Sequence, residues 1–316
     1  MAPLPPEPDG EALLPVDGVE YPQVLRNEGY FWWRSLGGVV VGLSLFLLLT
    51  TVVSQVVVAI AWAVLAPSTP YAVYVTSALA FQRPSGMLGA NLGIATLIPI
   101  SWMLVAVVHQ VKPRWLASVQ PRIRWRYLLV SLGVAVGVFT GVVALSSLLE
   151  GGSTIRMQPG FWWFLAVILL TSPLQAAAEE IFFRGYLMQA LGSLVAQPWF
   201  GVLVSSVVFA LLHGTQNLPL FLDRLAFGLL AAVLVWRTGG LEAGIAAHIV
   251  NNVFAYVMAG LTTSIATVRG VQEIGWLDAA FDVGGFALFA ALAYLVSRLL
   301  RLRTRVSLSE PGSREA

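Results

Sequence analysis

A short polar motif interrupts an apolar segment of the chain at Glu179, Glu180 and Arg184. Ionisable groups within a bilayer cost about 2.5–3.5 kcal/mol each on insertion scales, so they indicate a function by default. On a helix, Glu180 and Arg184 are four residues apart on one face, which predicts an ion pair. Glu179 points about 100° away, so its carboxylate is expected to remain free to act as a base. Taken alone, the motif could also be the charged end of a membrane helix.

Two of the three histidines of the chain lie in other apolar segments. His213 follows Phe209 by four residues, and His248 lies four residues before Asn252, on the same face of a helix. Taken singly, such residues are typical of interfacial packing or of a hydrogen bond between membrane helices. Together with two carboxylates, they predict hydrolysis. A basic carboxylate takes a proton from water, a histidine shares it, and amide or imidazole donors stabilise an oxyanion. A peptide bond is the most natural target.

The elements that carry these residues are predicted from hydropathy. Of 316 residues, 58% are hydrophobic and 11% charged, against roughly 45–50% and 25% in soluble domains. There is no cysteine, which excludes disulfides, thiolate catalysis and zinc–thiolate sites. We expect an all-α, polytopic transmembrane bundle of about eight helices. The predicted spans are Gly37–Ala66, Gly86–His109, Tyr127–Leu149, Phe161–Ala178, Trp199–His213, Leu218–Trp236, Leu241–Gly260 and Phe281–Leu300.

The chain is divided here into three parts. Residues 1–28 are rich in proline and acidic residues and are predicted to be a disordered tail. Residues 29–303 form the transmembrane domain, with the chemical core at about 160–257, and residues 304–316 form a loose tail. Basic residues gather between Lys112 and Arg126 and again between Arg298 and Arg305. The positive-inside rule then places both termini in the cytoplasm of a multi-pass protein of the cell inner or plasma membrane. The charge thus indicates a lipid bilayer as partner and no nucleic acid.

The three motifs together resemble the CPBP family of intramembrane endopeptidases. They are Glu-Glu-x-x-Phe-Arg-Gly at 179–185, Phe-x-x-x-His at 209–213 and His-x-x-x-Asn at 248–252. That family includes type II CAAX prenyl endopeptidases and bacterial relatives linked to bacteriocin immunity. The resemblance implies that Glu179 and His213 activate water and that His248 and Asn252 stabilise the oxyanion. Glu180 and Arg184 are then structural support.

The expected substrate is a membrane-associated protein or peptide, cut in CAAX-type processing or in a related bacterial maturation or immunity reaction. The Ala, Gly, Val, Leu and Arg bias of the chain is typical of bacterial proteins. No cofactor is expected, because the chain lacks the His-Glu-x-x-His pattern of zinc peptidases. Zinc is the alternative, with Glu179, His213 and His248 as ligands. Two other functions stay open: a proton-coupled transporter and a catalytically inactive membrane scaffold of the same fold.

The predicted spans raise a conflict of depth. If the fourth span ends at Glu179 on the inner side and the fifth begins at Trp199, His213 lies near the outer side, far from the glutamates. A break at Pro173, with re-entry of the segment around Glu179, would bring the motifs together.

Overall fold

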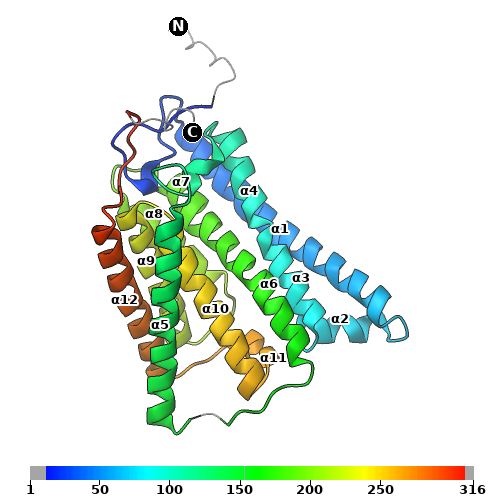
Figure 1. Cartoon of the computed structure of the whole chain (residues 1–316). Coiled ribbons are helices and arrows are strands. Elements are labelled where there is room, and N and C mark those ends of the chain that lie inside the picture. Colours follow the sequence, from blue (N-terminus) through cyan, green and yellow to red (C-terminus); the bar gives the residue numbers. More distant parts are fainter. Residues whose placement is uncertain (1–11, 153, 310–316) are drawn as a thin grey trace.

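The computed structural model describes residues 12–152 and 154–309 as a bundle of helices (Figure 1). Within these residues there are isolated β-bridges but no strands. Seven helical segments are long and apolar enough to cross a membrane, which confirms the predicted all-α, polytopic class. They are α1 (Trp32–Leu65), α3 to η2 (Pro84–Ala95, Leu97–Met103 and Leu104–Val108), α5 (Trp125–Glu150), α6 to α7 (Phe161–Glu179, η4 Glu180–Leu187 and Met188–Gly192), α9 (Leu218–Thr238), α10 (Glu242–Thr262) and α12 (Trp276–Leu299).

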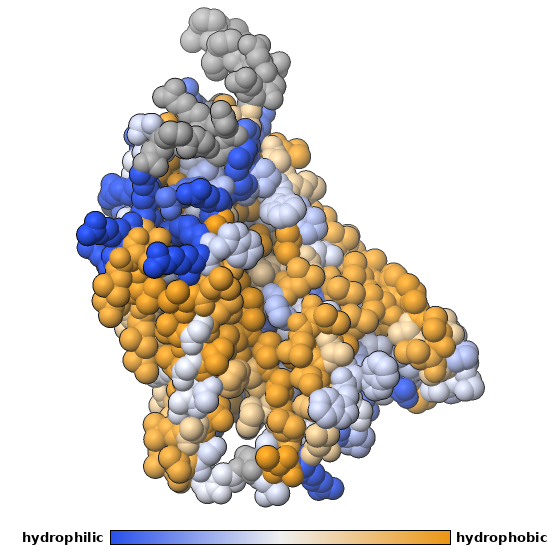
Figure 2. All heavy atoms as spheres, in the orientation of Figure 1, coloured by the Kyte–Doolittle hydropathy of each residue, from blue (hydrophilic) through white to orange (hydrophobic). Residues whose placement is uncertain are grey.

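The outer surface of the bundle has the pattern of a membrane protein. Apolar side chains form a wide band, and hydrophilic residues cover the end near the two termini (Figure 2). Exposed tryptophans mark both edges of the band, as in the aromatic belts of membrane proteins. Trp32, Trp33, Trp125 and Trp199 lie near the ends of their helices on the side of the termini, and Trp162, Trp163 and Trp276 lie on the other side.

Basic residues are distributed unequally between the two ends of the bundle. The arginine-rich face is the end that holds the described parts of both termini. It comprises Arg26, Arg34, Lys112, Arg114, Arg122, Arg124, Arg126, Arg237, Arg298, Arg301, Arg303 and Arg305. Toward the opposite end the described basic residues are Arg83, Arg156, Arg224 and Arg269.

The fifth predicted span is shorter than expected. Helix α8 (Trp199–Leu211) has 13 residues, too few to cross a hydrocarbon core of about 30 Å. It begins at the arginine-rich face and ends inside the bundle. Residues 212–217 then continue to the opposite end, where the backbone N–H of Asn217 donates to the carbonyl of Gln272. Helix α8 and residues 212–217 thus connect the two ends of the bundle, beside the seven described segments that are long enough to cross a membrane.

The conflict of depth is resolved differently from the prediction. The fourth span does not end at Glu179, because η4 and α7 continue it without a break to Gly192. Pro173 lies within a continuous helix, so the predicted re-entry at this position is wrong. Glu179 is therefore inside the membrane domain, about 27 Å along the helix from Phe161 at 1.5 Å per residue. Since α8 returns only part of the way, His213 reaches the same depth.

The predicted N-terminal tail lies partly outside the described residues. Residues 1–11 are not described, whereas residues 12–28 pack against the bundle. Tyr21, Val24 and Leu25 are fully buried, and Arg26 Nε donates to the carbonyl of Ser193 at 2.9 Å. The predicted disorder is therefore wrong for this part, because its few apolar side chains are buried against the helical bundle.

The predicted C-terminal tail behaves in the same way where it is described. Residues 310–316 lie outside the described residues. Val306 is buried, and its N–H donates to the carbonyl of Val19. The two chain ends thus hold each other on the arginine-rich face.

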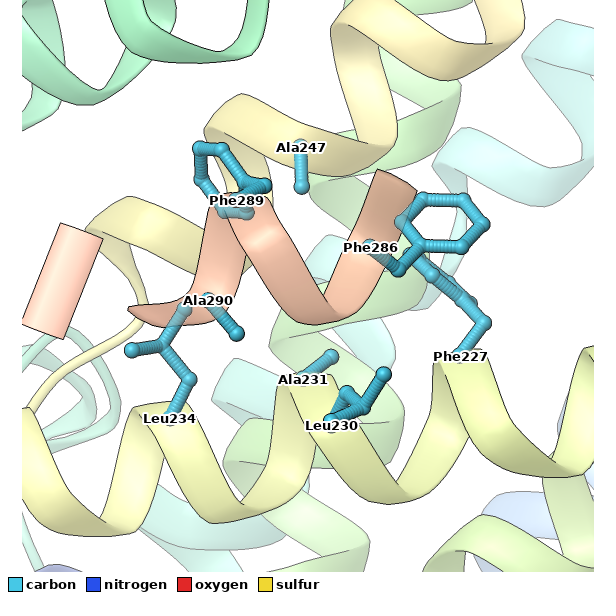
Figure 3. A pocket seen from close by; sticks show the side chains of 8 residues that line it. All are labelled: Phe227, Leu230, Ala231, Leu234, Ala247, Phe286, Phe289 and Ala290. Carbon is cyan, nitrogen blue, oxygen red and sulfur yellow. The ribbon is translucent and has the colours of Figure 1, made fainter. Parts of the chain in front are cut away.

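Apolar side chains fix α10 against α9 and α12 beside the polar motifs. They fill the space between α9, α10 and α12 and leave almost no room between them (Figure 3). They are Phe227, Leu230, Ala231, Leu234, Ala247, Phe286, Phe289 and Ala290. The position of His248, which follows Ala247, is therefore set by close packing.

Candidate active site

The glutamate motif lies where α6 changes into the π-helical segment η4. Short π-helical segments within α-helices occur frequently at functional sites. Arg184 Nη1 donates to Glu180 Oε1 at 2.9 Å, and both side chains are almost fully buried. The guanidinium also lies 4.0 Å from the centre of the Phe209 ring, a favourable cation–π contact. The predicted ion pair is present.

His248 connects the two glutamates. Its Nδ1 lies 2.8 Å from Glu180 Oε1 and its Nε2 lies 3.4 Å from Glu179 Oε2. The angle between neighbouring helix positions suggested that Glu179 would be separate from the ion pair of Glu180 and Arg184. His248 instead connects Glu179 to this pair. That angle describes one helix, whereas the imidazole comes from α10 and is long enough to reach both carboxylates.

A glycine allows α10 to approach the glutamates so closely. A Cβ atom on Gly244 would lie 2.7 Å from Glu180 Oε2, closer than a real Cβ contact. Gly244 is one turn before His248 on the same helix. The close approach of the two backbones therefore sets the reach of the imidazole.

His213 lies at the open end of α8, and its tautomer follows from its partner. Nδ1 lies 2.7 Å from the carbonyl oxygen of Phe209. A carbonyl only accepts, so Nδ1 carries a hydrogen and Nε2 of the neutral ring is free to accept a proton. The amide of Gln216 donates to the next carbonyl, that of Ala210. These side chains satisfy helix-end carbonyls that would otherwise have no partner within the membrane domain.

Three amides form a short chain beside the carboxylates. Asn252 Nδ2 donates to Gln175 Oε1 at 2.9 Å, and Asn251 Nδ2 donates to Asn252 Oδ1 at 3.3 Å. These contacts fix which end of the Asn252 amide carries the hydrogens. One of its two N–H groups remains for another acceptor.

A cavity of about 620 Å³ brings the predicted site residues together. Glu179, His213, His248 and Asn252 all line it. Its size is within the range of about 300–1,000 Å³ that is typical of ligand sites. Glu180 and Arg184 are not among the described residues that line it.

The residues do not form an evident metal site. Among the described residues, no three His, Asp or Glu side chains are grouped closely enough to hold a metal ion. Glu179 and His248 are adjacent, but His213 does not complete a ligand set with them in this arrangement. Zinc binding by Glu179, His213 and His248 therefore stays a prediction.

Several residues of the site were missed from the sequence. Gln175 is an amide one turn before Glu179 in an apolar helix, and that isolated polar position was its only signal. Arg124 and Glu242 form a buried ion pair with Nη2 and Oε2 2.5 Å apart. Arg124 Nη1 also donates to the carbonyl of Thr238. The pair joins the end of α9 to the start of α10, six residues before His248.

The buried site and the helical bundle define a polytopic membrane protein with the residues of a hydrolase. Comparison with known proteins gives its family. The profile of the family described as type II CAAX prenyl endopeptidase Rce1-like matches residues 161–254. The uncharacterized protein YyaK of Bacillus subtilis (strain 168) is 30% identical over 215 residues, which are 62% of this chain and 70% of that protein. No solved structure matches the chain.

The chain therefore belongs to the Rce1-like family of type II CAAX prenyl endopeptidases, and the expected resemblance is confirmed. The matched residues contain all three motifs and every residue of the predicted site. The family supports a membrane protease of the CAAX type in general terms.

Proposed function

We propose that the protein is an intramembrane endopeptidase in which Glu179 and His213 activate a water molecule. The observation that supports this most directly is the shared cavity, which Glu179, His213, His248 and Asn252 line from α6, the turn after α8, and α10. Nε2 of His213 is left free by the bond from Nδ1 to Phe209, so it can accept a proton from water. Glu179, partly screened from solvent, is the second acceptor.

His248 and Asn252 are the proposed donors to the oxyanion. With Nδ1 donating to Glu180, Nε2 of His248 carries a hydrogen only when the ring is protonated. Glu179, Glu180 and Arg184 together carry one net negative charge when ionised, which a protonated His248 balances. The free N–H of Asn252 is the second donor. Donors that are already oriented before the reaction stabilise a tetrahedral intermediate most effectively.

In this reaction the carboxylate and imidazole take a proton as the water oxygen attacks the peptide carbonyl. The carbonyl becomes a tetrahedral oxyanion held by the two donors. Collapse of the intermediate breaks the C–N bond, and the stored proton passes to the leaving amine. The proposal needs no metal. The termini are cytoplasmic in this proposal, because the arginine-rich face is the inner face.

Comparison of protein termini in whole membranes tests the function. Wild type, a deletion strain and a strain with Glu179→Ala are compared, and Glu28→Ala, an exposed carboxylate outside the site, is the matched control. We expect the same proteins to remain uncut in the deletion and Glu179→Ala strains only. Normal processing in the Glu179→Ala strain would contradict the proposal and favour an inactive scaffold. Ion-dependent uptake without cleavage would favour a transporter.

A further inference from the structure

The catalytic cavity extends toward one end of the bundle. Beyond the site it is lined by Leu79, Phe81, Val271 and Asp282. These residues lie near α2 (Tyr71–Leu79), α11 (Ile265–Gly270) and the start of α12, at the end opposite the described parts of the termini (Figure 1). Asp282 is solvent-exposed.

The arginine-rich face contributes nothing to this cavity. None of its basic residues as defined above is among the described residues that line it. Gly192 and Thr238, where α7 and α9 reach that face, also do not line the cavity. In the described structure, the route from the site to the surface therefore runs away from the face with most of the positive charge.

This arrangement gives the cavity a direction relative to the cell. Short loops rich in Lys and Arg remain in the cytoplasm. The arginine-rich face is then cytoplasmic, and the cavity is directed to the extracytoplasmic side. Residues 212–217, which cross the far half of the bundle without a helix, agree with this. Non-helical backbone at membrane depth is tolerated where it lines a water-accessible cavity, and His213 lines this one.

The lining of the outer part of the cavity indicates the chemistry of its ligand. It carries hydroxyl, amide and charged groups of both signs, namely Thr51, Gln55, Asp223, Arg224, Arg269 and Asp282. Charged groups in membrane segments face water or polar partners. Arg224 already donates to the carbonyl of His213 and to Gln216, but the buried Oδ1 of Asp223 has no partner among the described residues. A lipid chain would leave this oxygen unpaired, whereas a peptide backbone has N–H groups that can donate to it.

We infer that the site receives a polar, unlipidated peptide segment of a membrane-associated protein from the extracytoplasmic side. The inference rests on the proposed endopeptidase function and names the class of its substrate. Such a segment emerges from the membrane on the outer side and enters between α2, α11 and α12. Its scissile bond reaches Glu179 at the inner end of the cavity.

The natural absence of cysteine makes a labelling experiment direct. Single cysteines are placed in the cavity with Val271→Cys and Asp282→Cys, and in exposed controls with Ser68→Cys between α1 and α2 and Thr304→Cys on the arginine-rich face. A membrane-impermeant maleimide is applied to intact cells and to inside-out vesicles. We expect both cavity cysteines and Ser68→Cys to react in intact cells, and Thr304→Cys to react in inside-out vesicles only. Cavity cysteines that react together with Thr304→Cys would overturn the inference.

The uncut proteins in the Glu179→Ala strain test the substrate class. We expect their cleavage sites to lie in extracytoplasmic segments without a lipidated cysteine. Sites beside a lipidated cysteine at a cytoplasmic C-terminus would overturn it. If no protein remains uncut, the proposed function itself fails, whereas the labelling result still reports the direction of the cavity. The two failures are therefore distinguishable.

Discussion

Nδ1 of His248 lies 2.8 Å from Oε1 of Glu180, the same oxygen that accepts the bond from Arg184 Nη1. One carboxylate oxygen thus holds both a cation from its own helix and an imidazole from α10. This atom joins the ion pair of Glu180 and Arg184 to His248, one of the proposed oxyanion donors. Substitutions in the ion pair should therefore change the orientation of His248.

The first prediction concerns Glu180→Gln. Removing one partner of a buried ion pair costs about 3–5 kcal/mol, because the other charge stays buried and unpaired. We expect a lower melting temperature in detergent and loss of cleavage. The double variant Glu180→Gln with Arg184→Met removes both charges and should recover much of the stability but not the activity, since Nδ1 of His248 still lacks its carboxylate acceptor. Recovery of full activity in the double variant would show that the pair acts through stability alone.

The second prediction separates two roles of His213. The amide nitrogen of asparagine can occupy the position of Nδ1, so His213→Asn keeps a donor for the Phe209 carbonyl and removes Nε2. We expect this variant to melt near the wild-type temperature and to lose about 10²–10⁴-fold in kcat, the usual contribution of acid–base catalysis. His213→Ala should lose both activity and some stability. Equal activity of His213→Asn and the wild type would contradict the assignment of Nε2 as a proton acceptor.

The sequence predicted the parts of the fold that depend on hydropathy alone. Six of the eight predicted spans have boundaries near those observed, and the fifth corresponds to α8, which is too short to cross the membrane as a helix. The segment from Glu179 to Gly192 was not predicted, because its charged residues lower the local hydropathy. Besides the nearby Arg184, Glu180 has His248 as a partner, 68 residues further along the chain. Hydropathy within a window cannot include a partner so distant.

The sequence predicted which residues form the candidate site, but it did not predict how they contact one another. The motifs identified the polar residues, since such groups are costly within a membrane. The contact of His248 with both glutamates depends on the close approach at Gly244, which no spacing reveals. Similarly, the buried Tyr21 and Val24 were hidden by the proline-rich and acidic composition around them.

The third prediction concerns Gln175, whose Oε1 accepts from Asn252 Nδ2. Gln175→Leu should leave Asn252 free to rotate, so that kcat falls while KM changes little. A loss of about 10–100-fold is expected, below the 10²–10³-fold cost of deleting a donor outright. Asn252→Ala should be worse, and the double variant should match Asn252→Ala because both act on one donor. Additive losses would show that Gln175 acts by another route.

The fourth prediction concerns metal. The proposed reaction uses only side chains of the chain, and among the described residues no three His, Asp or Glu side chains are grouped closely enough to hold a metal ion. Purified protein treated with strong chelators should therefore retain its activity, and metal analysis should find no stoichiometric zinc. Activity that is lost on chelation and restored by zinc would contradict the mechanism.

The fifth prediction compares two ion pairs on the arginine-rich face. Arg124 and Glu242 are buried and share several hydrogen bonds, whereas Arg305 and Glu20 form a pair in which Arg305 is largely exposed. Breaking the buried pair with Glu242→Ala should cost about 3–5 kcal/mol, but breaking the exposed pair with Arg305→Ala should cost about 0–1 kcal/mol. Since Glu242 also holds the start of α10, its loss should reduce cleavage by moving His248. Thermal unfolding in detergent and cleavage at low temperature measure the two effects. Equal melting temperatures of the two variants would show that the buried pair does not hold α10 in place.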